Sequence, residues 1–127
     1  MRTAKYFLSL GLLGLILAGC SATLTNLTPR QMVRSPTGLY PFEVKWDTTQ
    51  ETPVGGTIRA YVVVGMEAYP MQPVAMVRNR WETVVPIPGD QNKIDYNYKF
   101  EFIRKGPPQG RADSLFSPPY QLVIVNQ

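Results

Sequence analysis

Residues 94–102 read IDYNYKFEF, the longest run of alternating apolar and polar residues in the chain. Every second residue is apolar or aromatic, namely Ile94, Tyr96, Tyr98, Phe100 and Phe102. The positions between them are polar or charged. Unbroken alternation of this length matches the two-residue period of a β-strand and does not produce the apolar stripe of a helix. The stretch therefore predicts a long strand at the centre of a sheet, with one face buried.

Shorter segments rich in aromatic and β-branched residues flank this strand, and turn residues separate them every 8 to 12 residues or so. The predicted strands cover residues 22–28, 39–46, 57–65, 81–87, 93–103 and 120–126, with a further short strand at 74–77. Two prolines make 66–73 a predicted connection, and 104–119 is predicted as a long loop rich in glycine and proline. No segment after residue 28 shows a convincing helical period.

These strands predict an all-β fold, a single antiparallel β-sandwich of six to seven strands that spans residues 24–127. The pattern resembles immunoglobulin-like and fibronectin type III-like domains, although it lacks the Cys–Trp–Cys spacing of true immunoglobulin domains. A small transthyretin-like sandwich has a similar pattern. Both strand orders therefore remain open.

The N-terminus has the features of an export signal. Arg2 and Lys5 precede an uncharged apolar run that ends at Leu17. This run is about 12 residues long, whereas a helix that spans a bilayer needs about 20. Leu17, Ala18, Gly19 and Cys20 close the run, and Cys20 is the only cysteine of the chain. This ending resembles the lipobox of bacterial lipoprotein precursors. The alternative is a conventional signal peptide with an incidental cysteine.

The lipobox resemblance implies cleavage between Gly19 and Cys20, removal of residues 1–19 and acylation of Cys20 as the new N-terminus. Residues 20–23 would then form the lipidated cysteine and a tether that reaches roughly 10 Å. Ser21 resembles the pattern of lipoproteins that are sorted to the outer membrane. The expected location is therefore the cell envelope, with the domain anchored to a membrane and facing the periplasm.

Composition argues against most enzyme classes. Histidine is absent and the only cysteine is the predicted lipid carrier, so histidine-based triads, zinc sites with histidine ligands and cysteine nucleophiles are excluded. The acids on the strands, Glu43, Asp47, Asp95 and Glu101, are interpreted as a solvated surface. Removal of Arg2 and Lys5 would lower the formal net charge of +4. The positive charge that remains is too small and too scattered along the chain to indicate nucleic-acid binding. We expect no enzymatic activity, no cofactor and no metal.

The predicted loop 104–119 is the candidate partner-binding segment, with Arg111, Leu115 and Phe116 as its candidate residues. The alternative is that Phe116 folds back over an open end of the core. The functional hypothesis is a structural or interaction module that binds an envelope protein. A second hypothesis is a carbohydrate- or peptidoglycan-binding module with an aromatic platform of Tyr61, Tyr69 and Trp81. Five basic residues could contact anionic lipid headgroups, and the alternative is that they form an ordinary solvated surface: Arg78, Arg80, Arg104, Lys105 and Arg111.

Overall fold

The computed structural model describes residues 23–47, 56–105 and 110–127. Within these residues the chain forms nine strands and no helix, which confirms the all-β class. The strands are β1 (Thr23–Asn26), β2 (Gln31–Val33), β3 (Leu39–Asp47), β4 (Arg59–Val64), β5 (Glu67–Pro73), β6 (Arg80–Pro86), β7 (Lys93–Arg104), β8 (Arg111–Phe116) and β9 (Tyr120–Val125).

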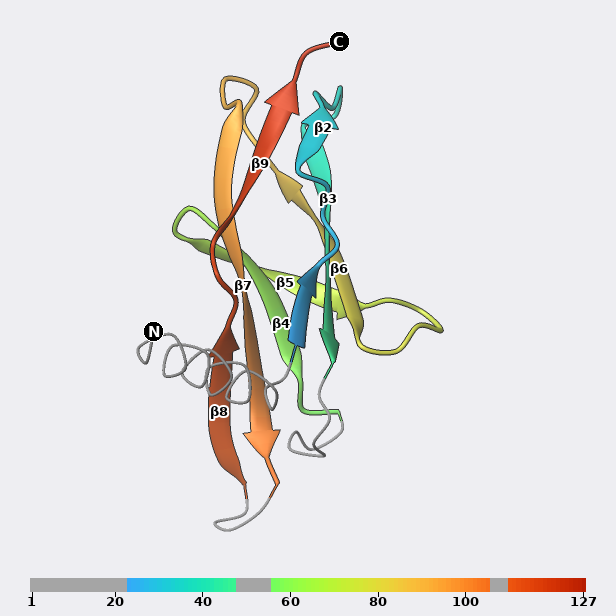
Figure 1. Ribbon diagram of the computed structural model, residues 1–127, viewed down its shortest axis with the longest axis vertical. Helices are drawn as coiled ribbons and strands as arrows, with labels where there is room; N and C mark the ends of the chain where they lie inside the picture. The colour runs from blue at the N-terminus through green and yellow to red at the C-terminus, as the bar shows by residue number, and fades with distance from the viewer. Residues whose placement is uncertain (1–22, 48–55, 106–109) are drawn as a thin grey trace, which may run out of the picture.

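The strands form one curled sheet in the order β1-β3-β6-β5-β4-β7-β9-β2, with β8 paired to β7 (Figure 1). Strand β5 turns the corner, because its first part pairs with β4 whereas Gln72 and Pro73 pair with β6. Strands β1, β3 and β6 thus face β4, β7 and β9. All pairs are antiparallel except β2 with β9, which is parallel. The sheet is therefore mixed, and it has more strands than the six to seven predicted.

The core lies between the two halves of the curled sheet and consists largely of aromatic rings. The ring of Phe42 on β3 meets that of Tyr96 on β7 edge-on, with centroids 4.9 Å apart. Trp46 and Trp81 both contact Phe100, with centroid distances of 5.0 and 5.2 Å. All five apolar positions of residues 94–102 are buried, so the prediction of a central strand with one buried face is confirmed.

The prediction of a loop over 104–119 is wrong. Strand β7 continues to Arg104, and β8 returns along it from Arg111 to Phe116. Five of the six β8 residues, RADSL, have little or no strand preference, but the edge of β7 offers backbone groups that need partners. Pairing with β7 therefore outweighs local preference.

The predicted connection 66–73 and the predicted strand 74–77 are also wrong. Residues 67–73 form β5, although two of them are prolines. At Pro70 this strand pairs with β4 alone, so it is an edge strand at this position. An edge strand tolerates proline, because the missing N–H does not have to serve a second neighbouring strand. Residues 74–79 then form the connection between β5 and β6.

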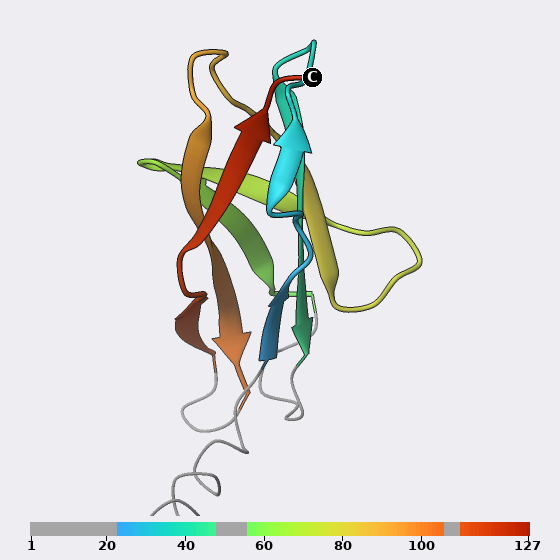
Figure 2. The same ribbon diagram turned by 45° about the horizontal axis from the view of Figure 1, so that its top comes forward.

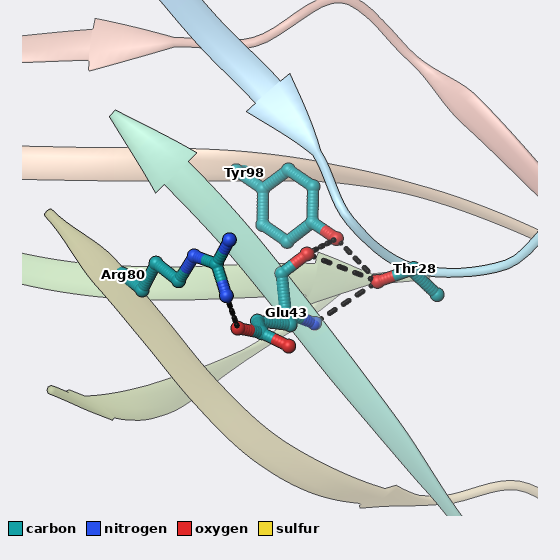
Figure 3. A network of polar contacts seen from close by, with 4 residues as sticks. All are labelled: Thr28, Glu43, Arg80 and Tyr98. Atoms are coloured by element: carbon teal, nitrogen blue, oxygen red, sulfur yellow. Dashed lines mark hydrogen bonds and ion pairs between the residues drawn. The ribbon is translucent and has the colours of Figure 1, made fainter. Parts of the chain in front are cut away.

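The strand predicted over 22–28 is shorter than expected and ends at Asn26, and an unpredicted strand, β2, follows it at Gln31–Val33. Strand β1 pairs with β3 as far as Asn26, and the chain then crosses over so that β2 pairs with β9. At the crossing the buried Thr28 hydroxyl accepts a hydrogen bond from the Glu43 N–H at 3.0 Å and lies 2.7 Å from the Tyr98 hydroxyl (Figure 3). The Tyr98 hydroxyl also donates to Asn26. This polar cluster fastens the N-terminal segment to β3 and β7.

Candidate functional site

The lipobox residues Leu17, Ala18, Gly19 and Cys20 lie outside the described residues. The first described strand begins at Thr23, three residues after Cys20. A search of the described part of the chain finds no helix that is both long and apolar enough to cross a bilayer. Acylation of Cys20 therefore stays a prediction.

The structure separates the three residues of the predicted partner-binding segment. Arg111 is exposed at the start of β8. Leu115 is partly buried and packs against the core, opposite Phe100 in the register. Phe116 points to the other side of the sheet and is 58% exposed, so it does not fold back over the core. Arg111 and Phe116 are thus the exposed members of the three, Leu115 is only partly accessible, and the role of this segment in partner binding stays a prediction.

Phe116 belongs to a row of side chains on the outer face of the sheet. Neighbouring strands place Pro70, Tyr61, Lys99 and Phe116 side by side, on β5, β4, β7 and β8 respectively. Their neighbours along each strand point inward, which is why the alternation leaves these four outside. The Lys99 ammonium lies 5.8 Å from the centroid of the Phe116 ring and 2.8 Å from the Glu101 carboxylate. We call these four residues the outer row.

A shallow hollow of about 430 Å³ lies beside the outer row, towards the far end of β7. Arg59, Glu101 and Ser114 cross its floor as register partners. At its rim Arg104 donates hydrogen bonds to the Asp113 carboxylate, which lowers the pKa of that carboxyl group. The outer face thus combines two aromatic rings with charged groups, several of which are already paired.

The three aromatic residues of the predicted carbohydrate platform do not come together. Trp81 is buried against Phe100. Tyr69 packs against the core side of the sheet, whereas Tyr61 lies on the outer face. Only Tyr61 is therefore placed to contact a ligand on the outer row.

A groove of about 760 Å³ lies at the other end of the molecule between β5, β6 and β7. Glu67, Tyr69 and Asp95 line it, and a hydrogen bond to Glu67 raises the pKa of Tyr69. Both carboxylates are exposed to solvent. Among the described residues no group of three or more acidic, histidine or cysteine side chains is placed to hold a metal ion.

The four acids interpreted as a solvated strand surface all have polar partners. Glu43 pairs with Arg80 (Figure 3), Asp47 pairs with Lys45, Glu101 pairs with Lys99, and Asp95 accepts a hydrogen bond from Gln121. Ion pairs of this exposed kind contribute little to stability. These partners agree with the interpretation as a surface network.

Sequence reasoning missed the outer row because its members come from four strands and meet only through the register. One signal was available. Lys99 occupies an outward position of a strongly alternating strand, and Tyr61 on β4 faces away from the side shared by Ala60 and Val62. The position of Phe116 beside Lys99 depends on β8, which local preference does not predict.

No protein-family model matches the sequence, and no curated protein is significantly similar to it.

Proposed function

We propose that this chain is a lipid-anchored cell-envelope protein, a non-enzymatic interaction module that holds its outer row against a protein partner. The observation that carries the proposal is Phe116, a large ring 58% exposed on an edge strand and aligned with Tyr61 across Lys99. Exposed aromatic side chains on a rigid sheet are typical anchors of protein interfaces. Cys20 supplies the lipid anchor, to the outer membrane with the domain in the periplasm.

The fold supports a rigid presenting role. We assign an immunoglobulin-like sandwich, with β1-β3-β6 as one layer, β4-β7-β9 as the other and β5 at the corner. Three features support this order over a transthyretin-like one: the central place of β7, the switch of β5 between layers, and the division of the N-terminal segment between β1 and β2.

The edge of β8 adds a second reason to expect a protein partner. Along its length β8 pairs with β7 alone among the described residues. An unpaired strand edge offers backbone N–H and C=O groups to a strand of another chain. A partner strand added to β8 would lie directly beside Phe116.

Photocrosslinking in cells tests the interface. We expect a crosslinker at Ser114 to capture an envelope protein, and Phe116→Ala to reduce that capture strongly. The matched control is Val84→Ala, since Val84 is 55% exposed on the outer face of β6 in the other half of the sheet. Equal capture by the two alanine variants would refute the assignment of the outer row.

The anchor needs its own test. Cys20→Ser should block palmitate incorporation and leave an uncut precursor that retains residues 1–19. Normal processing of this variant would contradict the lipobox assignment.

A carbohydrate-binding role is the second candidate, because Tyr61 and Phe116 place two rings on one face. Sugars stack on such rings when the rings are exposed. Cosedimentation with peptidoglycan would separate the two functions. Loss of sedimentation in both Tyr61→Ala and Phe116→Ala would favour the carbohydrate role.

A further inference from the structure

The connection between β5 and β6, residues 74–79, carries an apolar tip that the fold does not use. Figures 1 and 2 both show this loop projecting from the body, on the opposite side from the β4–β5 turn. Met76 is 105% exposed and Val77 is 42% exposed. A side chain with this exposure makes no packing contact, so Met76 contributes nothing to the core.

The backbone of the loop is held in an unfavourable conformation. Met76 has φ +62° and Asn79 has φ +64°, the left-handed region that glycine adopts more readily than other residues. A hydrogen bond from the Val77 N–H to the Val74 carbonyl closes a turn with Met76 inside it. Strained positions that packing does not explain are common where a protein meets a ligand or partner.

The base of this loop is fastened to the end of β3 that pairs with the start of β1. The Trp46 N–H donates to the Asn79 carbonyl at 2.9 Å, and the Asn79 side chain lies 3.5 Å from the Asp47 carboxylate. Asp47 is also the register partner of Thr23 on β1. The loop therefore ends on the β3 residue that pairs with Thr23, which follows Cys20 by three positions in the sequence.

One cation adjoins the apolar tip, and two more lie on the strands at the base of the loop. Arg78 is exposed and makes no ion pair with any described residue. Lys45 and Arg80 lie opposite each other in the register close by, paired with Asp47 and Glu43 respectively. Apolar side chains next to a cation are the combination that enters the interface of an anionic bilayer.

We propose that the 74–79 loop is a membrane-docking loop. Met76 and Val77 enter the lipid interface next to the acylated Cys20, and Arg78 contacts headgroup phosphates. The inference rests on the proposed anchor, because the lipid brings the loop to the bilayer. Two attachment points, rather than one tether, would then fix the orientation of the outer row relative to the membrane.

Fluorescence quenching in vesicles tests the loop. The acylated mature protein, carrying Met76→Cys labelled with bimane, is placed in vesicles of phosphatidylethanolamine and phosphatidylglycerol with bromine on the acyl chains. The matched control is Met66→Cys, since Met66 is 102% exposed but lies in the β4–β5 turn on the opposite side. We expect quenching at position 76 and none at position 66. Val77→Asp should lower the docked population about tenfold, by loss of one apolar contact.

The possible outcomes separate the loop from the anchor. If the chain floats with the vesicles and position 76 is no more quenched than position 66, the docking loop is refuted and the anchor stands. A chain that does not float with vesicles overturns the anchor and the docking loop with it. Arg78→Glu should reduce quenching in vesicles with phosphatidylglycerol and leave it unchanged in neutral vesicles. Equal quenching in both lipids would overturn the assignment of Arg78.

Discussion

Replacing Thr28 by valine removes one hydroxyl and keeps the shape of the side chain. That hydroxyl accepts the hydrogen bond of the Glu43 N–H, at the point where the chain has left β1 and no strand partner remains on that side of β3. In the variant the Glu43 carbonyl still accepts a hydrogen bond from the Leu27 N–H, and the Tyr98 hydroxyl still donates one to the Asn26 side chain. The loss is therefore concentrated on one backbone donor.

A buried donor left without a partner costs about 1–3 kcal/mol of folding free energy. Because the neighbouring polar groups keep their other hydrogen bonds, we expect Thr28→Val to destabilise the protein by about 2 kcal/mol. For a domain of about 100 residues this lowers Tm by about 10 °C. Thr28→Ser keeps the hydroxyl and loses one methyl group, so it should cost about 1 kcal/mol. The order of stability is then wild type, Thr28→Ser, Thr28→Val.

Tryptophan fluorescence measures this order. Trp46 and Trp81 are the only two tryptophans and both are buried, so their emission follows unfolding in urea or on heating in non-ionic detergent. Thr25→Val on the exposed side of β1 is the control and should stay within about 0.5 kcal/mol of wild type. A Thr28→Val protein as stable as Thr28→Ser would show that the hydroxyl does not stabilise the crossing.

Three further predictions concern side chains already described. Burial raises the pKa of Tyr98, so the contribution of this residue to stability should be constant below pH ~10 and then fall by about 1.4 kcal/mol per pH unit as the tyrosine of the unfolded chain ionises; Tyr98→Phe should reduce this slope in alkaline urea titrations. Leu115→Ala should cost about 2 kcal/mol in urea unfolding, whereas Phe116→Ala should cost less than about 0.5 kcal/mol. Arg104 lowers the pKa of Asp113, so the contribution of this ion pair to stability is present at neutral pH and lost as the pH falls below about 4. An NMR titration should show that Asp113 protonates at a lower pH than an ordinary aspartate, and Arg104→Gln should abolish this difference.

The sequence predicts those parts of the fold in which apolar and polar residues alternate along a single strand. Alternation over residues 94–102, and from Tyr40 to Trp46, identifies β7 and β3 with the correct buried faces. Pro86 marks the end of β6, as its missing N–H predicts. In each case the information lies within a few neighbouring residues.

The parts that were missed depend on partners far away in the chain. Strand β8 forms because β7 is long enough to need a second neighbour after β9 ends its pairing at Tyr96. Strand β2 has three residues, and its parallel pairing follows from the crossing at Thr28. The outer row and the loop at Met76 likewise arise from register and turn geometry, which composition does not reveal.

The crossing from β1 to β2 has a mechanical consequence under the proposed anchoring. Any pull between the membrane and a partner enters the domain at Thr23 and runs along β1, so the ladder with β3 is loaded in shear and its hydrogen bonds resist together. Behind this ladder, Thr28 and Asn26 hold the Tyr98 hydroxyl and transfer the load to the central strand β7. If the chain is anchored as proposed, β1 is thus placed to resist such a pull along its whole length.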